Sequence, residues 1–160
     1  MLGDPLNSFQ IRIGKQADLR GICLVEEDSF SEPYPHGLIA RLLQDCPNGF
    51  FVAERHPGTI IGYCVATENE RSAHLISIGV LREYRRHGVG TALVRRLLSS
   101  LGSRLEELRL EVKEGNVEAI KLYDEIGFKQ VERIPNYYED RATAVKMALT
   151  LHQDAELSRR

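Results

Sequence analysis

The chain has 160 residues and a mass of 18.1 kDa, and 42% of its residues are hydrophobic. That content suffices for one sizeable core but not for two. A formal net charge of −2 and a sequence pI near 6.2 give no electrostatic reason to expect nucleic-acid or membrane binding. No stretch approaches the roughly 20 apolar residues that span a bilayer, and residues 1–10 do not resemble a secretory signal. We therefore expect one soluble, cytoplasmic domain over residues 1–150 and a polar tail over residues 151–160.

The first half of the chain predicts one strand, two helices and three further strands. Residues 9–13 alternate apolar and polar side chains, whereas residues 17–30 and 37–43 carry apolar side chains at helical spacing. Three β-branched or aromatic runs separated by turn signals then indicate an antiparallel meander, over residues 50–54, 59–67 and 74–80.

The second half alternates helices and strands. Helical spacing recurs over residues 91–101 and 117–126, and Gly127 is placed to end the latter helix. The intervening and following runs predict strands at residues 107–112, 128–134 and 143–149. Strands before and after helices in a short chain favour a mixed α/β sheet that helices cover on both faces.

The three cysteines and four of the five histidines are assigned no reactive role. The cysteines have no C-x-x-C spacing, and two of them fall in apolar segments, so we expect buried structural thiols in a reducing compartment: Cys23, Cys46 and Cys64. Four histidines lack metal-ligand spacing, and no metal is predicted: His36, His56, His87 and His152.

The most informative stretch is Arg85-Arg86-His87-Gly88-Val89-Gly90, between an apolar run and a helix start. Two glycines permit close backbone approach, and the first N–H groups of the helix point at an anion. The arginines add forked donors that suit phosphate oxygens. Neither G-x-G-x-x-G nor G-x-x-x-x-G-K-[ST] is present, so a pyrophosphate carrier other than a dinucleotide or a nucleoside triphosphate is indicated. A plain helix start with solvated arginines is the alternative.

A second constellation lies in residues 110–128. Asn116 and Tyr123 fall on one face of the expected helix, about 10 Å apart along its axis. That face carries an amide and a phenol. Asn116 can equally be the N-cap of this helix, and Tyr123 a core side chain.

The spacing Arg85-x-x-Gly88-x-Gly90 resembles the coenzyme A loop of the GCN5-related N-acetyltransferase (GNAT) superfamily, and residues 110–128 resemble the second half of that domain. The resemblance implies a GNAT fold, a mixed, mostly antiparallel seven-stranded sheet with about four helices. It also implies that acetyl-CoA is the cosubstrate, held by Ile78, Gly79, Val80, Arg85, Arg86, His87, Gly88, Val89, Gly90, Thr91, Asn116 and Tyr123.

Within that superfamily, three segments resemble protein N-terminal acetyltransferases of the archaeal and ribosomal-protein alanine types: residues 29–35, 74–80 and 136–138. The resemblance implies that a slot for a peptide N-terminus is shaped by Phe30, Glu32, Pro33, Tyr34, Tyr137 and Tyr138. Glu32 can equally be a solvated loop charge.

Acetyl transfer needs a neutral amine and a proton for the departing thiolate. On neighbouring strands, Glu111 and His74 can relay the amine proton, and Tyr123 can protonate the sulfur. An α-amine has a reference pKa of roughly 7.8, against roughly 10.4 for lysine, so the free energy needed to deprotonate it is about 3.5 kcal/mol lower. A structural histidine and an ion-paired carboxylate are the alternatives for His74 and Glu111.

The leading hypothesis is an acetyl-CoA-dependent N-alpha-acetyltransferase that transfers acetyl directly to protein or peptide N-termini in a ternary complex. One alternative is acetylation of a small amine, such as a polyamine, amino acid or antibiotic, and another is a non-catalytic CoA-binding module. Neither nucleic acid nor membrane is expected as a partner. Monomer and homodimer, the need for an auxiliary subunit, and acceptance of lysine side chains all stay open.

Overall fold

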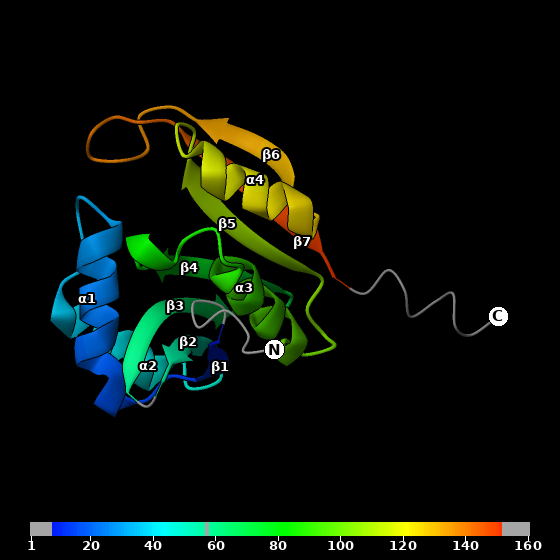
Figure 1. Cartoon of the computed structure of the whole chain (residues 1–160). Helices are drawn as coiled ribbons and strands as arrows, with labels where there is room; N and C mark the ends of the chain where they lie inside the picture. The colour runs from blue at the N-terminus through cyan, green and yellow to red at the C-terminus, as the bar shows by residue number, and fades with distance from the viewer. Residues whose placement is uncertain (1–7, 57, 152–160) are drawn as a thin grey trace, which may run out of the picture. The chain divides into compact units, whose positions relative to one another are not determined.

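The computed structural model describes residues 8–56 and 58–151 (Figure 1). Beyond residue 151, the expected polar tail lies outside the described residues. Seven strands form one sheet in the order β1-β2-β3-β4-β5-β7-β6. The strands are β1 Gln10–Ile13, β2 Phe50–Arg55, β3 Thr59–Glu68, β4 Ser72–Val80, β5 Glu107–Lys113, β6 Lys129–Ile134 and β7 Ala144–Thr150. β4 and β5 pair in parallel, and the pairs β1–β2, β2–β3, β5–β7 and β6–β7 are antiparallel. The prediction of a mixed, mostly antiparallel seven-stranded sheet is confirmed.

The described residues contain four α-helices, each close to a predicted helix: α1 Leu19–Ser29, α2 His36–Asp45, α3 Val89–Ser100 and α4 Val117–Ile126. The predicted helix over residues 17–30 is shorter at its start, because Gln16–Asp18 form a 3-10 turn, η2. The Asp18 carboxylate accepts the Lys15 N–H there at 2.8 Å, which favours the tight turn. None of the described helices has both the length and the apolar character needed to cross a membrane.

The chain divides into two compact units. Unit 1 consists of Met1–Thr67 and Ile76–Ser100, and unit 2 consists of Glu68–Leu75 and Leu101–Arg160. Strand β4 contributes its first residues to unit 2 and its last residues to unit 1. A single domain over residues 1–150 stays a prediction.

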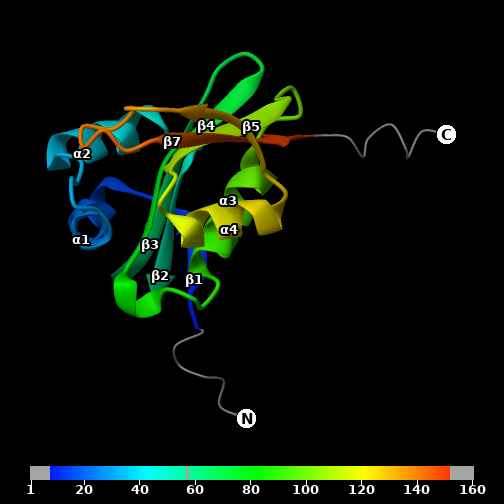
Figure 2. The ribbon, with the colours of Figure 1, turned by 90° about the horizontal axis from the view of Figure 1, so that it is seen from above.

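In unit 1, strands β2 and β3 bury side chains on both faces. Phe50 stacks on Tyr63, with ring centroids 5.7 Å apart, on the face where α1 and α2 supply Ile22 and Ile39 to the same buried cluster. On the opposite face α3 packs closely, and the Arg96 guanidinium lies 4.9 Å from the centroid of Phe51. Figure 2 shows α1 and α2 on one side of these strands and α3 on the other. Two buried faces explain why β2 and β3 are continuous apolar runs.

In unit 2, β5 alternates strictly between buried and half-buried residues. Its apolar side chains, Leu108, Leu110 and Val112, are buried. Gly127, with a φ of +119°, ends α4 beside Leu149, the β7 partner of Leu108, so α4 closes over the apolar face. The other face of β5 carries Glu107, Arg109, Glu111 and Lys113, as period-2 geometry requires. This polar face is the one available for chemistry.

The three cysteines are buried and form no disulfide. Burial raises the pKa of Cys23 and of Cys46, and raises that of Cys64 to about 12. A thiol with a raised pKa is a poor nucleophile. The prediction that all three thiols are buried is confirmed.

Candidate active site

An acid–base pair joins β4 to β5 in unit 2. His74 pairs in register with Arg109, two residues before Glu111, which places His74 and Glu111 on the same polar face. His74 Nε2 lies 2.5 Å from Glu111 Oε2. The His74 side chain is 45% exposed and that of Glu111 is 19% exposed. A half-exposed imidazole bonded to a shielded carboxylate can accept a proton from a solvent-borne group and share it with that carboxylate.

The predicted tyrosine pair lies close to that carboxylate. Tyr137 and Tyr138 contact edge to face, with centroids 5.0 Å apart, and both N–H groups donate to the carbonyl of Ala142. Burial, and secondarily the charge of Glu111, raise the pKa of Tyr137. Lys113, two residues after Glu111 on the same face of β5, lies 5.2 Å from the centroid of the Tyr138 ring. Unit 2 therefore brings His74, Glu111 and the tyrosine pair together.

Lys113 extends this polar face. Its ammonium lies 5.2 Å from the centroid of Tyr138 and 2.8 Å from Asp140 Oδ2. The ion pair lowers the pKa of Asp140. Lys113 and Asp140 were missed from the sequence, since the pair joins a strand to a loop 27 residues later.

Helix α4 carries the other predicted groups of unit 2. Asn116 is its N-cap, with the side-chain carbonyl accepting the Ala119 N–H at 3.2 Å, so the N-cap alternative is confirmed. Tyr123 is buried and contacts Phe128 edge to face, with centroids 5.6 Å apart.

In unit 1, the arginine–glycine loop has the expected positive φ at Gly88 but not at Gly90, which lies in α3. Arg86 and Gly88 adopt positive φ values of +65° and +79°, and a Cβ at Gly88 would meet nothing within 4 Å. At the start of α3, the Ala92 N–H donates to Gly88 O at 3.0 Å. Among the described residues, the preceding N–H groups of Val89, Gly90 and Thr91 have no backbone acceptor one turn back. An open glycine followed by such donors fits a phosphate group.

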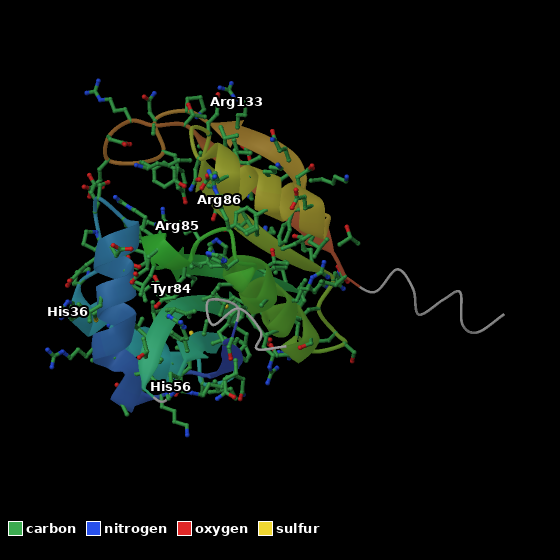
Figure 3. The ribbon with its side chains drawn as sticks, in the orientation of Figure 1. His36, His56, Tyr84, Arg85, Arg86 and Arg133 are labelled. Atoms are coloured by element: carbon green, nitrogen blue, oxygen red, sulfur yellow. The ribbon has the colours of Figure 1, made fainter. Side chains whose placement is uncertain are left out.

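Side chains fix this loop to its surroundings (Figure 3). Arg85 Nε donates to the carbonyl of Val80 at 3.1 Å, and Ser29 Oγ donates to the same oxygen at 3.3 Å. Tyr84 accepts a hydrogen bond of 2.7 Å from Arg55, whose guanidinium also lies over its ring. One donor of the Arg85 guanidinium is thus bonded to the last residue of β4.

The segment between α1 and α2 contains the remaining predicted residues. Phe30, Glu32 and Pro33 are exposed, and Tyr34 is half-buried. The Tyr34 N–H donates to Glu26 Oε1 at 2.9 Å, while the Tyr63 hydroxyl donates to Glu26 Oε2. The sequence prediction missed Glu26. Its signal is its position four residues after Ile22, on the buried stripe of a helix where a charge is costly.

Among the residues that the structure describes, no three His, Cys, Asp or Glu side chains gather into a group that could hold a metal ion. His36 lies 2.7 Å from Glu27 at the start of α2.

The described residues form a mixed sheet, an open glycine loop at a helix start, and a His–Glu pair on two parallel strands. Residues 19–128 match the family model described as the Acetyltransferase (GNAT) family. The chain therefore belongs to the GNAT acetyltransferases and is an N-acetyltransferase, a family whose cosubstrate is acetyl-CoA.

Similarity to known relatives extends over nearly the whole chain. The chain is 32% identical over 157 residues to an N-alpha-acetyltransferase of Sulfurisphaera tokodaii, covering 89% of this chain and 93% of the relative. The crystal structure of Ard1 from Thermoplasma volcanium superposes with a TM-score of 0.85 at 30% identity, covering 91% of this chain and 99% of that one. The ribosomal-protein-S18-alanine N-acetyltransferase of Escherichia coli gives a TM-score of 0.78 at 27% identity, with 90% and 94% covered.

Proposed function

We propose that this chain transfers the acetyl group of acetyl-CoA to the free α-amine of protein or peptide N-termini. The observation that carries the proposal is the His74–Glu111 pair, 2.5 Å apart, beside the tyrosine pair in unit 2. A weak base of this kind suffices for an α-amine, whereas a lysine amine loses its proton at a cost about 3.5 kcal/mol higher. Similarity to an archaeal N-alpha-acetyltransferase supports the same acceptor.

The carrier would be held mainly by backbone groups of unit 1. Gly88 and the N–H groups of Val89, Gly90 and Thr91 suit its pyrophosphate, with Arg86 and His87 beside them. The backbone of Ile78, Gly79 and Val80 would hold the pantetheine arm. Two side chains already donate to the Val80 carbonyl. At Val80 we therefore assign the hydrogen bond to the pantetheine arm to the N–H group. Bound acetyl-CoA supplies an activated acetyl thioester.

The protein's own groups handle the protons. The amine nitrogen bonds to the acetyl carbon as the carbon–sulfur bond breaks. Glu111 and His74 together take the proton that the amine loses, and the Tyr123 hydroxyl gives one to the departing sulfur. We also propose that Asn116 and Tyr123 of unit 2 bind the carrier.

We propose direct transfer within a ternary complex. An acetyl-enzyme route would need an activated nucleophile. The three thiols are buried, and burial raises the pKa of each, which supports transfer without an acyl-cysteine. We propose that the acceptor contacts Phe30, Pro33 and Tyr34 of unit 1, with Glu32 beside them, and Tyr137 and Tyr138 of unit 2.

The enzyme is proposed to act in the cytoplasm, without a metal, as a monomer or homodimer. The test is release of CoA from acetyl-CoA by the purified chain. Peptides with varied first residues, the same peptides with blocked α-amines, and a polyamine panel are offered separately. The proposal expects release only with free peptide α-amines. Release with polyamines alone would instead establish a small-amine acetyltransferase.

A further inference from the structure

The last turn of α1 carries three consecutive acidic residues, Glu26, Glu27 and Asp28. Successive residues of an α-helix point about 100° apart, so the three carboxyl groups face different parts of unit 1. Each has a different partner, and two of these partners are backbone N–H groups in the segments that the proposed function assigns to the two substrates.

Glu26 fixes the segment between α1 and α2. Its side chain is 2% exposed, and a buried carboxyl group is tolerated only when its oxygens are hydrogen-bonded. One oxygen accepts the Tyr34 N–H at 2.9 Å, and the other accepts the Tyr63 hydroxyl. Tyr63 also lies 2.8 Å from Ser77 Oγ on β4. Burial, and then the charge of Glu26, raise the pKa of Tyr63, which keeps its hydroxyl protonated as a donor.

The position of Tyr34 makes its bond to Glu26 decisive for this segment. Tyr34 lies between Pro33 and Pro35, and proline has no N–H group. The Tyr34 amide is therefore the only backbone donor of these three residues. Its bond to a buried carboxyl group holds the middle of the segment to α1.

Asp28 fixes the other segment. Its Oδ2 accepts the Arg82 N–H at 2.7 Å, and Arg82 begins the 3-10 turn η3, Arg82–Tyr84, which leads directly into the loop at residues 85–90. The neighbouring Ser29 donates to the Val80 carbonyl at 3.3 Å. The same helical turn thus bonds the last residue of β4, Val80, and the first residue of η3, Arg82.

Glu27 provides a natural comparison. It lies 2.7 Å from His36, and the side chains of Glu27 and His36 are 49% and 66% exposed. Exposed ion pairs contribute little to stability, and Glu27 accepts no backbone N–H that the structure records among the described residues.

We propose that Glu26 and Asp28 are positioning residues with separate duties: Glu26 sets the acceptor segment at residues 30–35, and Asp28 sets the carrier loop at residues 85–90. This division rests on the proposed function for the meaning of the two segments. The hydrogen bonds themselves can be tested without it.

The experiment compares Glu26→Gln, Asp28→Asn and the matched control Glu27→Gln. Amide hydrogen exchange measures the two bonds, since a neutral acceptor holds an N–H more weakly than a carboxylate. Exchange at Tyr34 should become about fivefold faster in Glu26→Gln alone, and exchange at Arg82 about fivefold faster in Asp28→Asn alone. Steady-state kinetics should show a KM for peptide raised about fivefold by Glu26→Gln, and a KM for acetyl-CoA raised about fivefold by Asp28→Asn.

These measurements test whether Glu26 and Asp28 have separate positioning roles. Equal effects of both variants on both KM values, or exchange rates like those of Glu27→Gln, would overturn the division. If Glu26→Gln does not fold, Tyr63→Phe removes one donor to Glu26 and should raise the peptide KM without raising that of acetyl-CoA. If the wild-type chain acetylates no peptide, the proposed function fails, while the exchange rates at Tyr34 and Arg82 still test the positioning bonds.

Discussion

The two units hold their candidate functional groups in different ways. In unit 1 the groups are mainly backbone atoms of the loop at residues 85–90. Ser29 and Arg85 donate to the Val80 carbonyl before this loop, and Asp28 accepts the Arg82 N–H. In unit 2 they are side chains on the polar face of a sheet, His74 and Glu111 above all. Binding of a phosphate-bearing carrier suits fixed backbone donors, whereas proton transfer needs titratable side chains. The units therefore predict separable defects, in carrier affinity for unit 1 and in turnover for unit 2.

The largest effect is expected on the acid–base pair. The double variant His74→Ala with Glu111→Gln removes both proton acceptors, and kcat near neutral pH should fall about 10²- to 10⁴-fold. Glu107→Gln is the control, since Glu107 lies on the same face of β5 and is ion-paired with Arg109 at 3.1 Å. A double variant with full turnover would refute the proton relay.

Tyr123→Phe removes only the hydroxyl from a buried ring. Loss of a proton donor should lower kcat by about 10²-fold at unchanged affinity for CoA. Calorimetric titration with CoA, beside initial rates, separates the two quantities. Unchanged turnover would remove Tyr123 from the reaction, and a weakened CoA affinity alone would reassign it to binding.

Gly88→Ala should weaken CoA binding about tenfold, because an alanine at φ +79° is strained and its Cβ enters the open space that the phosphate would occupy. Gly58→Ala is a matched control. Gly58 has a φ of +89° and equally open surroundings, but it lies between β2 and β3. We expect Gly88→Ala and Gly58→Ala to lose similar amounts of stability, but only Gly88→Ala to bind CoA more weakly. Equal CoA affinities of the two variants would contradict the assignment of the loop at residues 85–90 to CoA binding.

The smallest effect concerns pH. The hydrogen bond from Arg12 lowers the pKa of Asp18 below its usual value of 3.8, so the unfolded state binds the proton more readily. Asp18 therefore contributes stability above pH 3.8 that is lost as the pH falls through its folded-state pKa. Asp18→Asn should cost about 1–2 kcal/mol at pH 7 and less at pH 3, measured by denaturant unfolding. Asp45→Asn, in an exposed pair with Arg41, should cost under about 0.5 kcal/mol at both pH values.

The comparison of the units also explains what the sequence could predict. The conformation of the loop at residues 85–90 depends on its own residues, such as Gly88. Its motif can therefore be recognised from six consecutive residues. The strands and helices could also be predicted from the sequence. For example, the apolar periodicity of Val117–Ile126 and the glycine that follows, Gly127, predict helix α4 and its end.

Contacts between distant segments were less accessible. Glu26 and Tyr63 lie 37 residues apart, and the apolar run around Tyr63 gives no sign of a polar partner. His74 and Glu111 are also 37 residues apart. They were predicted through family resemblance, since spacing alone could not reveal the parallel pairing of β4 with β5.

The most direct test of the account uses one peptide that carries both a free α-amine and an internal lysine. The purified enzyme and acetyl-CoA are added near neutral pH, and fragment masses locate the acetyl group. The account predicts acetylation of the α-amine, with loss of product in the double variant of His74 and Glu111. Acetylation of the lysine alone, or an acetylated α-amine that survives removal of both side chains, would contradict it.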